Sequence, residues 1–362
     1  RSHIQIERVG SLDPNRLFRK KGVVKMPSEN WRKILTFLSD TFFIPDNKIG
    51  WKRKALKAAE KLIEKNNFDV IFATAPPFTD FLIGTELHNK FRKPLVLDYR
   101  DPWHEYPLKY YPTPLHKLRN YQLEKKVLRS ASKVITTNRR VKELLLKRYK
   151  FLQYQDVVIL PQGYDPQDFA SGAGNIQPTH KMRVTHAGVF FGDRTPEYFL
   201  RALKKVFTEH PETKGNIEAC FIGNFHDQHF KMIQQLGLEA DVQTTGYLDH
   251  LQCVKYLQAS DVLWLMLNNH TQSPGKLYEY FGARKPVLAC VPEGFIRQTI
   301  EETGAGAIVN PDDVDGIAKA LVMYYQQNKL KKLPQPKEVV VNQYSRVELT
   351  NELSKIFGFL VE

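Results

Sequence analysis

One short segment near residue 275 has residue types that suit the binding of a phosphorylated ligand. Pro274 and Gly275 form a tight turn into a predicted helix, and the unpaired backbone N–H groups at a helix start attract anions. Lys276 adds a positive charge at this start. Glu279 lies one turn into the helix, where a carboxylate can accept two hydrogen bonds from a vicinal diol such as ribose. The same residues would also suit an ordinary surface helix with a solvated Glu–Lys pair.

The elements that position this segment alternate regularly along the chain. Short apolar runs predict strands, and the segments between them have the apolar spacing of helices. Strands that alternate with helices in this way indicate a parallel sheet with helices on both faces. The expected strands of a first unit are 69–73, 95–98, 133–136 and 156–160, and those of a second unit are 182–186, 217–222, 241–244, 261–266, 286–290 and 307–309.

The sequence therefore predicts an α/β protein of two Rossmann-like domains. A stretch rich in Gly, Ser and Pro at 169–180 is typical of a linker. We predict an N-terminal domain at 1–168, a second domain at 181–345, and a C-terminal helix at 346–362 that packs back on the body. Ligands of open parallel sheets bind beyond the carboxyl ends of the strands, so two such domains that face each other would form the site in the cleft between them.

The positive charge of the chain is confined to its first half. The net charge is +14, but residues 1–160 contain 33 Lys and Arg against 16 Asp and Glu, whereas residues 161–362 contain 20 against 23. A basic domain of this kind implies a polyanionic partner, either a nucleic acid or an anionic membrane surface. The sequence has no RRM, KH or helix-turn-helix pattern, which argues against a nucleic-acid-binding protein.

Several classes of protein are excluded by composition. No run is long and apolar enough to span a bilayer, and the run 262–267 is typical of a buried strand. The three cysteines are too few and too scattered for a disulfide framework or a zinc site, so we expect buried thiols in a reducing cytosol. The sequence begins at Arg1, with neither Met nor a signal peptide, and residues 3–9 are predicted to form a strand.

The segment 273–289 resembles the donor-binding motif of the family-4 retaining glycosyltransferases, which have the two-domain GT-B fold. The match is to the variant of the motif with the sequence Pro-Gly-Lys-Leu-Tyr-Glu-Tyr. Many members have two glutamates in this motif, and the second corresponds to Glu279. Thr271 stands at the position of the first, so a hydroxyl or a backbone N–H would replace an acidic contact with the donor sugar.

Other segments of the second half resemble the family in the same order along the chain. The segment 186–196 resembles the first strand and loop of the donor domain, in which Arg194 corresponds to the arginine that binds the diphosphate. The segments 221–223 and 246–250 resemble those that flank the nucleotide base. The resemblance implies a donor site of Gly188, Arg194, Gly223, Tyr247, Leu248, Ser273, Pro274, Gly275, Lys276, Leu277 and Glu279.

Two segments of the first half also resemble the family. The segment 97–103 resembles a strand-end motif that faces the cleft beside the transferred sugar, and 75–79 resembles a turn on the acceptor side. Asp101 and His104 are the candidates for catalytic contact, together with Arg194 and Lys276, although Asp before Pro is also a common turn residue. The acceptor-side residues would be Pro77, Phe78, Thr79, Arg100 and Trp103. The family's first strand and glycine-containing loop have no counterpart, so we expect further residues ahead of Arg1.

The resemblance implies transfer of a sugar, with retention, from a nucleoside diphosphate sugar to a glycan or lipid-linked acceptor in bacterial surface polysaccharide or glycolipid synthesis. A departing diphosphate and an oxocarbenium-like sugar need oriented positive charge, which Arg194, Lys276 and the helix start at Gly275 would supply. The sequence has no Asp-x-Asp motif and no metal-ligand spacing, so neither a metal nor another cofactor is expected. A nucleotide-sugar epimerase of the same architecture is the alternative enzyme.

Two basic and aromatic segments suggest an anionic membrane surface as a partner. Helical spacing forms one apolar stripe, flanked by Arg32 and Lys33, from Trp31, Ile34, Leu35, Leu38 and Phe42. A second segment begins at 109–111 and contains Lys117, Arg119, Lys125, Lys126 and Arg129. The stripe would equally suit packing into a domain core. The second segment would equally suit a solvated helix face. The expected location is cytoplasmic or peripheral on the inner face of the cell membrane, and no nucleic-acid partner is expected.

Overall fold

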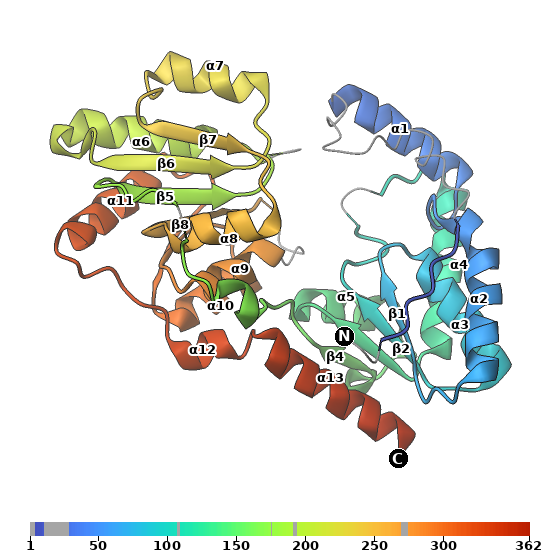
Figure 1. Cartoon of the computed structure of the whole chain (residues 1–362). Helices are drawn as coiled ribbons and strands as arrows, with labels where there is room; N and C mark the ends of the chain where they lie inside the picture. The colour runs from blue at the N-terminus through green and yellow to red at the C-terminus, as the bar shows by residue number, and fades with distance from the viewer. Residues whose placement is uncertain (1–3, 11–28, 107–108, 175, 191–193, 269–273) are drawn as a thin grey trace. The chain divides into compact units, whose positions relative to one another are not determined.

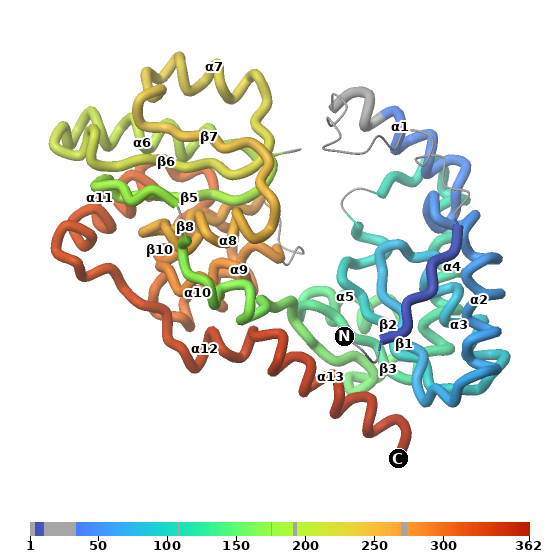
Figure 2. The backbone as a smooth tube through the Cα atoms, viewed as in Figure 1, coloured from blue at the N-terminus to red at the C-terminus, as the bar shows by residue number. Residues whose placement is uncertain are grey.

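The computed structural model describes residues 4–10, 29–106, 109–174, 176–190, 194–268 and 274–362 (Figures 1 and 2). Contacts divide the chain into two compact units. Unit 1 consists of Arg1–Leu160 and Leu353–Glu362, and unit 2 consists of Pro161–Glu352. Each unit has a parallel β-sheet with helices packed against it, so the predicted α/β class with two Rossmann-like domains is confirmed.

The sheet of unit 1 has four parallel strands in the order β1-β2-β3-β4, which is also their order along the chain. Strand β2, inside the sheet, is buried over its whole length, and its alternate residues Leu95, Leu97 and Tyr99 lie in one core cluster. The core on one face includes Phe81, Leu97 and Val134. The strands are β1 (Ile71–Ala75), β2 (Leu95–Tyr99), β3 (Lys133–Thr136) and β4 (Val157–Ile159).

The helices of unit 1 begin at residues suited to cap them. The Thr113 hydroxyl caps α4, where Pro114 occupies the first turn, and the Asn138 side chain accepts a hydrogen bond from Val141 N at the start of α5. The helices are α1 (Glu29–Phe42), α2 (Lys52–Lys65), α3 (Thr79–Phe91), α4 (Pro114–Ser130) and α5 (Arg139–Arg148), with short 3-10 turns at Ile49–Trp51 and Tyr154–Asp156.

Residues 4–10 do not form the strand that the sequence predicts. They have no strand partner and run beside helix α2 instead (Figure 2). Val9 packs against the small apolar cluster around Ala55, Ile83 and Leu87. Ile4 and Ile6, which carry the apolar alternation of this segment, are 70% and 68% exposed, so the alternation predicted a strand where the chain only runs beside a helix.

The sheet of unit 2 has six parallel strands in the order β10-β9-β8-β5-β6-β7. Strand β5 pairs with both β6 and β8, so the order of the strands reverses at β5. The strands are β5 (Met182–Ala187), β6 (Ile217–Ile222), β7 (Val242–Gly246), β8 (Val262–Met266), β9 (Val287–Cys290) and β10 (Gly306–Val309).

Helices cover both faces of this sheet. Alternate residues of β8 enter different cores, with Trp264 among the side chains of α6 and α11 and Leu265 among those of α9. The helices of unit 2 are α6 (Glu197–Glu209), α7 (Asp227–Leu236), α8 (His250–Gln258), α9 (Gly275–Ala283), α10 (Phe295–Thr303), α11 (Val314–Lys329) and α12 (Glu338–Asn342), with 3-10 turns at Pro166–Phe169 and Pro211–Thr213.

The chain passes between the units at two points. The predicted linker 169–180, as far as the structure describes it, belongs to unit 2. There the Phe169 ring contacts the Tyr164 ring edge-on at 5.9 Å between centroids. The last helix, α13 (Arg346–Val361), begins in unit 2, and its C-terminal part groups with unit 1, where Phe357 packs against Phe72 at 5.6 Å. All three cysteines are buried and free, as predicted.

Candidate active site

The reversal of strand order at β5 defines a candidate binding site in unit 2. In open α/β sheets, ligands bind outside the carboxyl ends of the strands at such a switch point. Gly188 directly follows β5, Gly223 follows β6, and Tyr247 and Leu248 follow β7. The parallel strands therefore bring three predicted donor-binding segments to one edge of the sheet.

Glycine is required where two of these segments touch. Gly223 has φ +135°, and a Cβ atom there would lie 2.1 Å from the carbonyl oxygen of Gly188. Gly188 N in turn donates to Ile222 O at 2.9 Å, and Gly223 N donates to Gly246 O at 2.9 Å. Close approach of backbone to backbone thus explains these glycines.

The two residues after Gly246 have different environments. Leu248 is half-buried and packs against the core of unit 2, whereas Tyr247 is 63% exposed. Tyr247 therefore presents an aromatic ring to solvent beside the strand ends.

Helix α9 begins at the position that the sequence predicts. Pro274 is at the N-cap with extended backbone, and proline has no side-chain acceptor that could cap the first turn. Gly275 is exposed, and Leu277 is buried and anchors the helix in the core. The backbone N–H groups at this start therefore face the environment as an anion-binding end. Ser273 and Thr271 lie outside the described residues.

Lys276 and Glu279 contact each other on this helix. Lys276 Nζ lies 2.6 Å from Glu279 Oε2, and it also donates to Cys253 Sγ at 3.8 Å. The two charged side chains are 34% and 21% exposed, so both reach the surface. Burial alone would lower the pKa of Lys276, but the neighbouring Cys253 and Glu279 outweigh burial and raise it. Lys276 therefore keeps its positive charge at neutral pH.

Two cations act on one buried imidazole at the end of β5. His186 is buried, and its Nδ1 donates to Trp264 O at 3.0 Å. Burial, assisted by the positive charges of Arg194 and Lys276, lowers the pKa of His186 to about 4. Burial also lowers the pKa of Arg194, although a guanidinium remains charged in proteins. The two predicted diphosphate-binding cations are thus close enough to His186 to affect its protonation.

Sequence analysis missed the residues that hold this site together. The buried hydroxyl of Tyr280 accepts a hydrogen bond from Ala187 N at 2.9 Å and donates to Trp264 O at 3.1 Å. It therefore ties α9 to both β5 and β8. Tyr280 is in the quoted donor motif, but neither its hydroxyl bonds nor the roles of His186 and Cys253 have a sequence signal, because their partners are distant in the chain.

The predicted residues of unit 1 lie around the carboxyl ends of β1 and β2. Arg100 is exposed and its Nη1 lies 3.7 Å from Asp98 Oδ2, which also accepts from Thr74 Oγ1 at 2.9 Å. Asp101 is half-buried, and burial raises the pKa of its carboxyl against the opposing charge of Arg100. Pro77 is half-buried. Asp101, Arg100 and Pro77 are therefore the predicted residues here that reach the surface.

Three of the predicted acceptor-side residues belong to the core instead. Phe78 stacks on Trp103 at 4.7 Å between centroids, and both side chains are buried. The Trp103 indole donates to Asn120 Oδ1 at 3.0 Å, and Thr79 bonds Asp46 through its backbone N and its hydroxyl. Because these three side chains are buried, we interpret Phe78, Thr79 and Trp103 as residues that position the strand-end loops. This replaces the prediction that they contact an acceptor.

His104 also faces the interior of unit 1. Its side chain is 5% exposed, and Nε2 lies 3.7 Å from Oε2 of the fully buried Glu124. Glu124 Oε2 accepts a hydrogen bond from Tyr149 OH at 2.6 Å. Burial raises the pKa of Glu124 to about 7 and lowers that of His104 to about 4. His104 is therefore suited to position its loop, rather than to touch a substrate as predicted.

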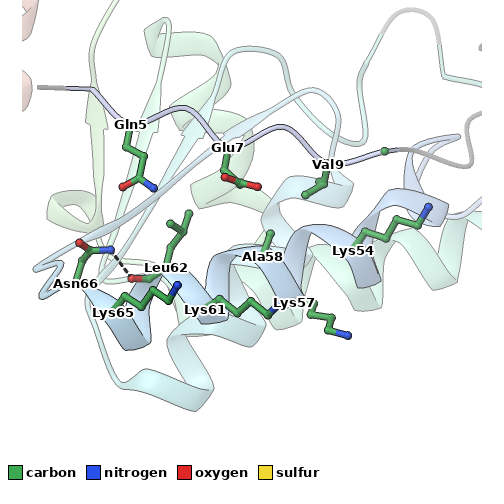
Figure 3. Close-up of a pocket in the computed structure, with 11 residues that line it drawn as sticks. Gln5, Glu7, Val9, Lys54, Lys57, Ala58, Lys61, Leu62, Lys65 and Asn66 are labelled. Atoms are coloured by element: carbon green, nitrogen blue, oxygen red, sulfur yellow. Dashed lines mark hydrogen bonds between the residues drawn. The ribbon is translucent and has the colours of Figure 1, made fainter. Parts of the chain in front are cut away.

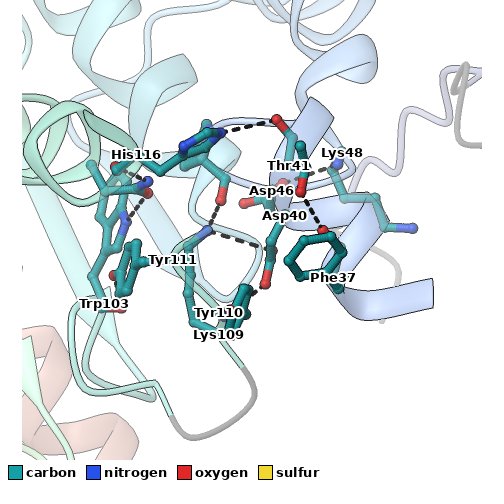
Figure 4. A network of polar contacts seen from close by, with 12 residues as sticks. Phe37, Asp40, Thr41, Asp46, Lys48, Trp103, Lys109, Tyr110, Tyr111 and His116 are labelled. Atoms are coloured by element: carbon teal, nitrogen blue, oxygen red, sulfur yellow. Dashed lines mark hydrogen bonds and ion pairs between the residues drawn. The ribbon is translucent and has the colours of Figure 1, made fainter. Parts of the chain in front are cut away.

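Helix α1 is joined to the loop that follows His104 by polar contacts at its C-terminal end (Figure 4). Asp40 Oδ2 accepts from Tyr110 N at 2.8 Å, and Lys109 Nζ lies 3.9 Å from Asp40 Oδ1. His116 Nε2 contacts Thr41 O at 3.1 Å. These contacts connect α1 with α4 and with the same loop region that contains Trp103.

The apolar stripe of α1 is not part of the core. Ile34, Leu35, Leu38 and Phe42 are 49%, 53%, 46% and 74% exposed, which excludes the core-packing alternative. Phe37, on the adjoining side, is exposed and contacts the Tyr110 ring at 5.2 Å. The side chains of Trp31, Arg32 and Lys33 are outside the described part of the structure. An exposed apolar helix face of this kind is typical of a contact surface.

Two family models match the chain over most of its length. Residues 25–168 match the model described as Glycosyltransferase Family 4, and residues 175–337 match the model described as Glycosyl transferases group 1. With two Rossmann-like units, the chain is a glycosyltransferase of the GT-B fold. It belongs to the family-4-like enzymes of that class, which confirms the resemblance seen in the sequence.

Solved structures with the same fold have low sequence identity to this chain. A glycosyltransferase from Rickettsia africae is 16% identical, with a TM-score of 0.65 over 85% of this chain and 80% of that chain. The HepE protein of Anabaena in complex with UDP is 16% identical, with a TM-score of 0.64 over 85% and 81%. A sucrose-phosphate synthase from Thermosynechococcus elongatus is 18% identical, with a TM-score of 0.64 over 88% and 80%. No curated protein sequence matches the chain.

None of the helices in the described residues has the length and apolar character needed to cross a membrane. Within the same ranges, no group of three or more His, Cys, Asp or Glu side chains is arranged to hold a metal ion.

The His104–Glu124 pair predicts a specific pH dependence of stability. Folding raises the pKa of Glu124 from 4.5 to about 7 and lowers that of His104 from 6.5 to about 4. Between pH 4.5 and 6.5, Glu124 therefore makes stability fall as pH rises, whereas His104 makes it rise, and the two effects oppose each other in the wild type. Glu124→Gln should leave a stability that rises with pH, and His104→Gln one that falls.

Calorimetric unfolding between pH 4.5 and about 8 measures these slopes. Glu64→Gln, at an exposed residue of α2, is the matched control and should follow the wild type. If the stability of all four proteins has the same pH dependence, folding does not shift the pKa values of Glu124 and His104 in opposite directions.

Proposed function

We propose that this glycosyltransferase uses a nucleoside diphosphate sugar and that unit 2 binds the donor. The observation that carries the proposal is the meeting of two cations, an uncapped helix start and a carboxylate at the switch point of the sheet. These groups are Arg194, Lys276, the start of α9 at Gly275, and Glu279. The Anabaena structure with UDP supports this class of donor.

The diphosphate would bind at the start of α9. Its oxygens can accept from the first-turn N–H groups of Gly275 and Lys276, while the side chains of Arg194 and Lys276 supply positive charge. Lys276 stays protonated because Cys253 and Glu279 raise its pKa. We propose that these groups stabilise the leaving diphosphate without a divalent metal, since preorganised positive charge performs the same electrostatic task.

The ribose of the nucleotide would contact Glu279. This carboxylate lies one turn inside α9 and already accepts from Lys276 through Oε2. Its second oxygen can accept from a ribose hydroxyl, and a charge-assisted bond of this type is stronger than a neutral one. The exposed ring of Tyr247 is suited to the base, which would lie beyond the ends of β6 and β7.

The proposed reaction proceeds with retention at the anomeric carbon. The bond between this carbon and the diphosphate oxygen breaks, and the acceptor oxygen forms a new bond on the same face. The acceptor proton passes to the leaving diphosphate, so no protein nucleophile is needed. This part of the proposal rests on the family resemblance.

Acceptor recognition is assigned to unit 1. Asp101, Arg100 and Pro77 are accessible at the strand ends, and the carboxylate of Asp101 is suited to orient a hydroxyl. We propose that the exposed face of α1 docks on an anionic membrane and that the acceptor is a glycan or glycolipid of a bacterial surface. The support is the apolar face together with the excess of Lys and Arg in residues 1–160.

Donor binding should depend on Arg194, Lys276 and Glu279. Loss of one charge-assisted contact should cost about 1.5–3 kcal/mol, or roughly tenfold to a hundredfold in affinity. Calorimetry with UDP, GDP and ADP measures this for Arg194→Ala, Lys276→Ala and Glu279→Ala. Losses at Arg194 and Lys276 should be larger for the diphosphate than for the monophosphate of the same nucleoside, whereas the loss at Glu279 should be equal for both.

Glu302→Ala and Lys319→Ala remove exposed charges of unit 2 elsewhere on its helices and serve as controls. Unchanged nucleotide affinity in all three folded site variants would exclude this donor site.

Asp101 should affect turnover rather than donor binding, because it belongs to unit 1. Asp101→Asn keeps the shape of the side chain and removes its charge. We expect kcat to fall by about tenfold or more, with little change in nucleotide affinity. Wild-type turnover in this variant would assign Asp101 to the turn that precedes Pro102 alone.

Removing apolar area from α1 should weaken membrane binding. Leu35→Ser with Leu38→Ser should lower partition onto anionic vesicles on the order of tenfold or more, since each buried leucine contributes at least about 1.5 kcal/mol when fully transferred. Vesicle co-sedimentation measures the effect, and added salt should weaken binding in both proteins. Leu330→Ser with Val339→Ser removes two exposed apolar side chains of unit 2, outside both basic segments, and is the matched control. Equal binding by both double variants would count against docking through α1.

A further inference from the structure

A basic groove lies in unit 1 between residues 4–10 and helix α2 (Figure 3). Its volume is about 630 Å³. Four exposed lysines of α2 line it, namely Lys54, Lys57, Lys61 and Lys65. The positions of these lysines, three or four residues apart, put them along one side of the helix. They form a row about 16 Å long at the helical rise of roughly 1.5 Å per residue.

The charge of this row is largely uncompensated. Glu7 is the only acidic residue among the described residues that line the groove. The ion pairs recorded for α2 use other side chains, since Lys52 pairs with Glu86 and Glu60 pairs with Lys90 at 3.0 Å. The groove therefore presents several like charges to one side, an arrangement that favours a ligand with repeated negative groups.

Apart from the lysines and Glu7, the lining is uncharged and includes amides that can bind hydroxyl groups. Val9, Ala58 and Leu62 contribute apolar surface between the two chain segments. Gln5 and Asn66 contribute amides near the end of the groove at Lys65 (Figure 3). The Asn66 amide nitrogen donates to Leu62 O at 2.9 Å, and this hydrogen bond fixes the orientation of the Asn66 side chain. Amides and small apolar surfaces beside a row of cations match a polymer that has both hydroxyls and charges.

The lining argues against two other polyanions. Proteins that bind single-stranded nucleic acid stack the bases on aromatic side chains, and the described lining of this groove contains no aromatic residue. A bilayer is a flat surface, whereas these lysines border a groove with a second chain segment on its other side. The exposed apolar stripe suited to a bilayer is on α1, and none of its residues lines this groove.

We propose that the groove binds a linear acidic glycan, with the carboxylate or phosphate groups of successive sugars against the lysine row. The sugar hydroxyls contact Gln5 and Asn66. The proposal rests on the proposed function, in which the enzyme extends a glycan, and it identifies the acceptor or product chain as anionic.

Calorimetry on the full chain with an oligogalacturonate, at low salt, tests the proposal. Lys57→Gln with Lys61→Gln should weaken binding roughly tenfold or more. Lys147→Gln with Lys150→Gln removes the same charge at exposed positions outside the groove, and this control should bind within about twofold of the wild type. A neutral maltooligosaccharide of equal length should bind at least roughly tenfold more weakly than the oligogalacturonate.

Several results would overturn the proposal. The wild type could fail to bind the oligogalacturonate, or it could bind the neutral oligosaccharide equally well. The two double variants could also lose the same amount of affinity for the oligogalacturonate. Poly(U) and anionic vesicles are measured in parallel. Tighter binding of either one, lost only in the Lys57 and Lys61 variant, would assign the groove to nucleic acid or to membrane and would also overturn the proposal.

Nucleotide affinity measured on the same variants separates this proposal from the proposed function. The Lys57 and Lys61 variant should bind UDP as the wild type does, because both residues lie outside unit 2. Absence of glycan binding by the wild type, with nucleotide binding intact, would contradict the groove proposal alone. Glycan binding without any nucleotide binding would contradict the proposed function and leave an acidic-glycan site.

Discussion

The buried hydroxyl of Tyr280 is the contact on which the candidate donor site depends. It accepts from Ala187 N at the end of β5 and donates to Trp264 O within β8. These strands are neighbours at the point where the strand order reverses. Helix α9 is thereby fixed relative to the sheet edge, and with it the directions of Lys276 and Glu279. A buried hydroxyl that loses its partners has a high desolvation cost, so this arrangement is rigid.

The same region combines positive charge with a neutral interior. His186 remains uncharged because it is buried and because the positive charges of Arg194 and Lys276 disfavour protonation of its imidazole. Its Nδ1 hydrogen bond to Trp264 O fixes the tautomer. The charge at the surface of the site is therefore set by the two cations and Glu279, which is the arrangement that an anionic ligand with a diol requires.

The two units have different electrostatic and packing characters. Residues 1–160 contain the entire positive excess, and unit 1 has both the lysine groove of α2 and the exposed apolar face of α1. In the same unit, Phe78, Trp103 and His104 are interior residues that hold the loop containing Asp101 against α4. The predicted acceptor-side residues that reach the surface are consequently a few side chains at the strand ends.

The sequence by itself determined the fold class, the order of strands and helices, and the start of α9, because these depend on local periodicity, on Pro and Gly at turns, and on a contiguous motif. It also located the candidate cations. Only the tertiary structure decided which candidates are accessible: Trp103 and His104 are near Asp101 in sequence, yet they point into the core. It also decided that residues 4–10 pack beside α2 and that the stripe of α1 is exposed, since an amphipathic pattern does not specify its partner. Burial of a side chain and the hydrogen bonds of Tyr280 and His186 depend on segments that are distant in the chain. The local sequence therefore does not predict them.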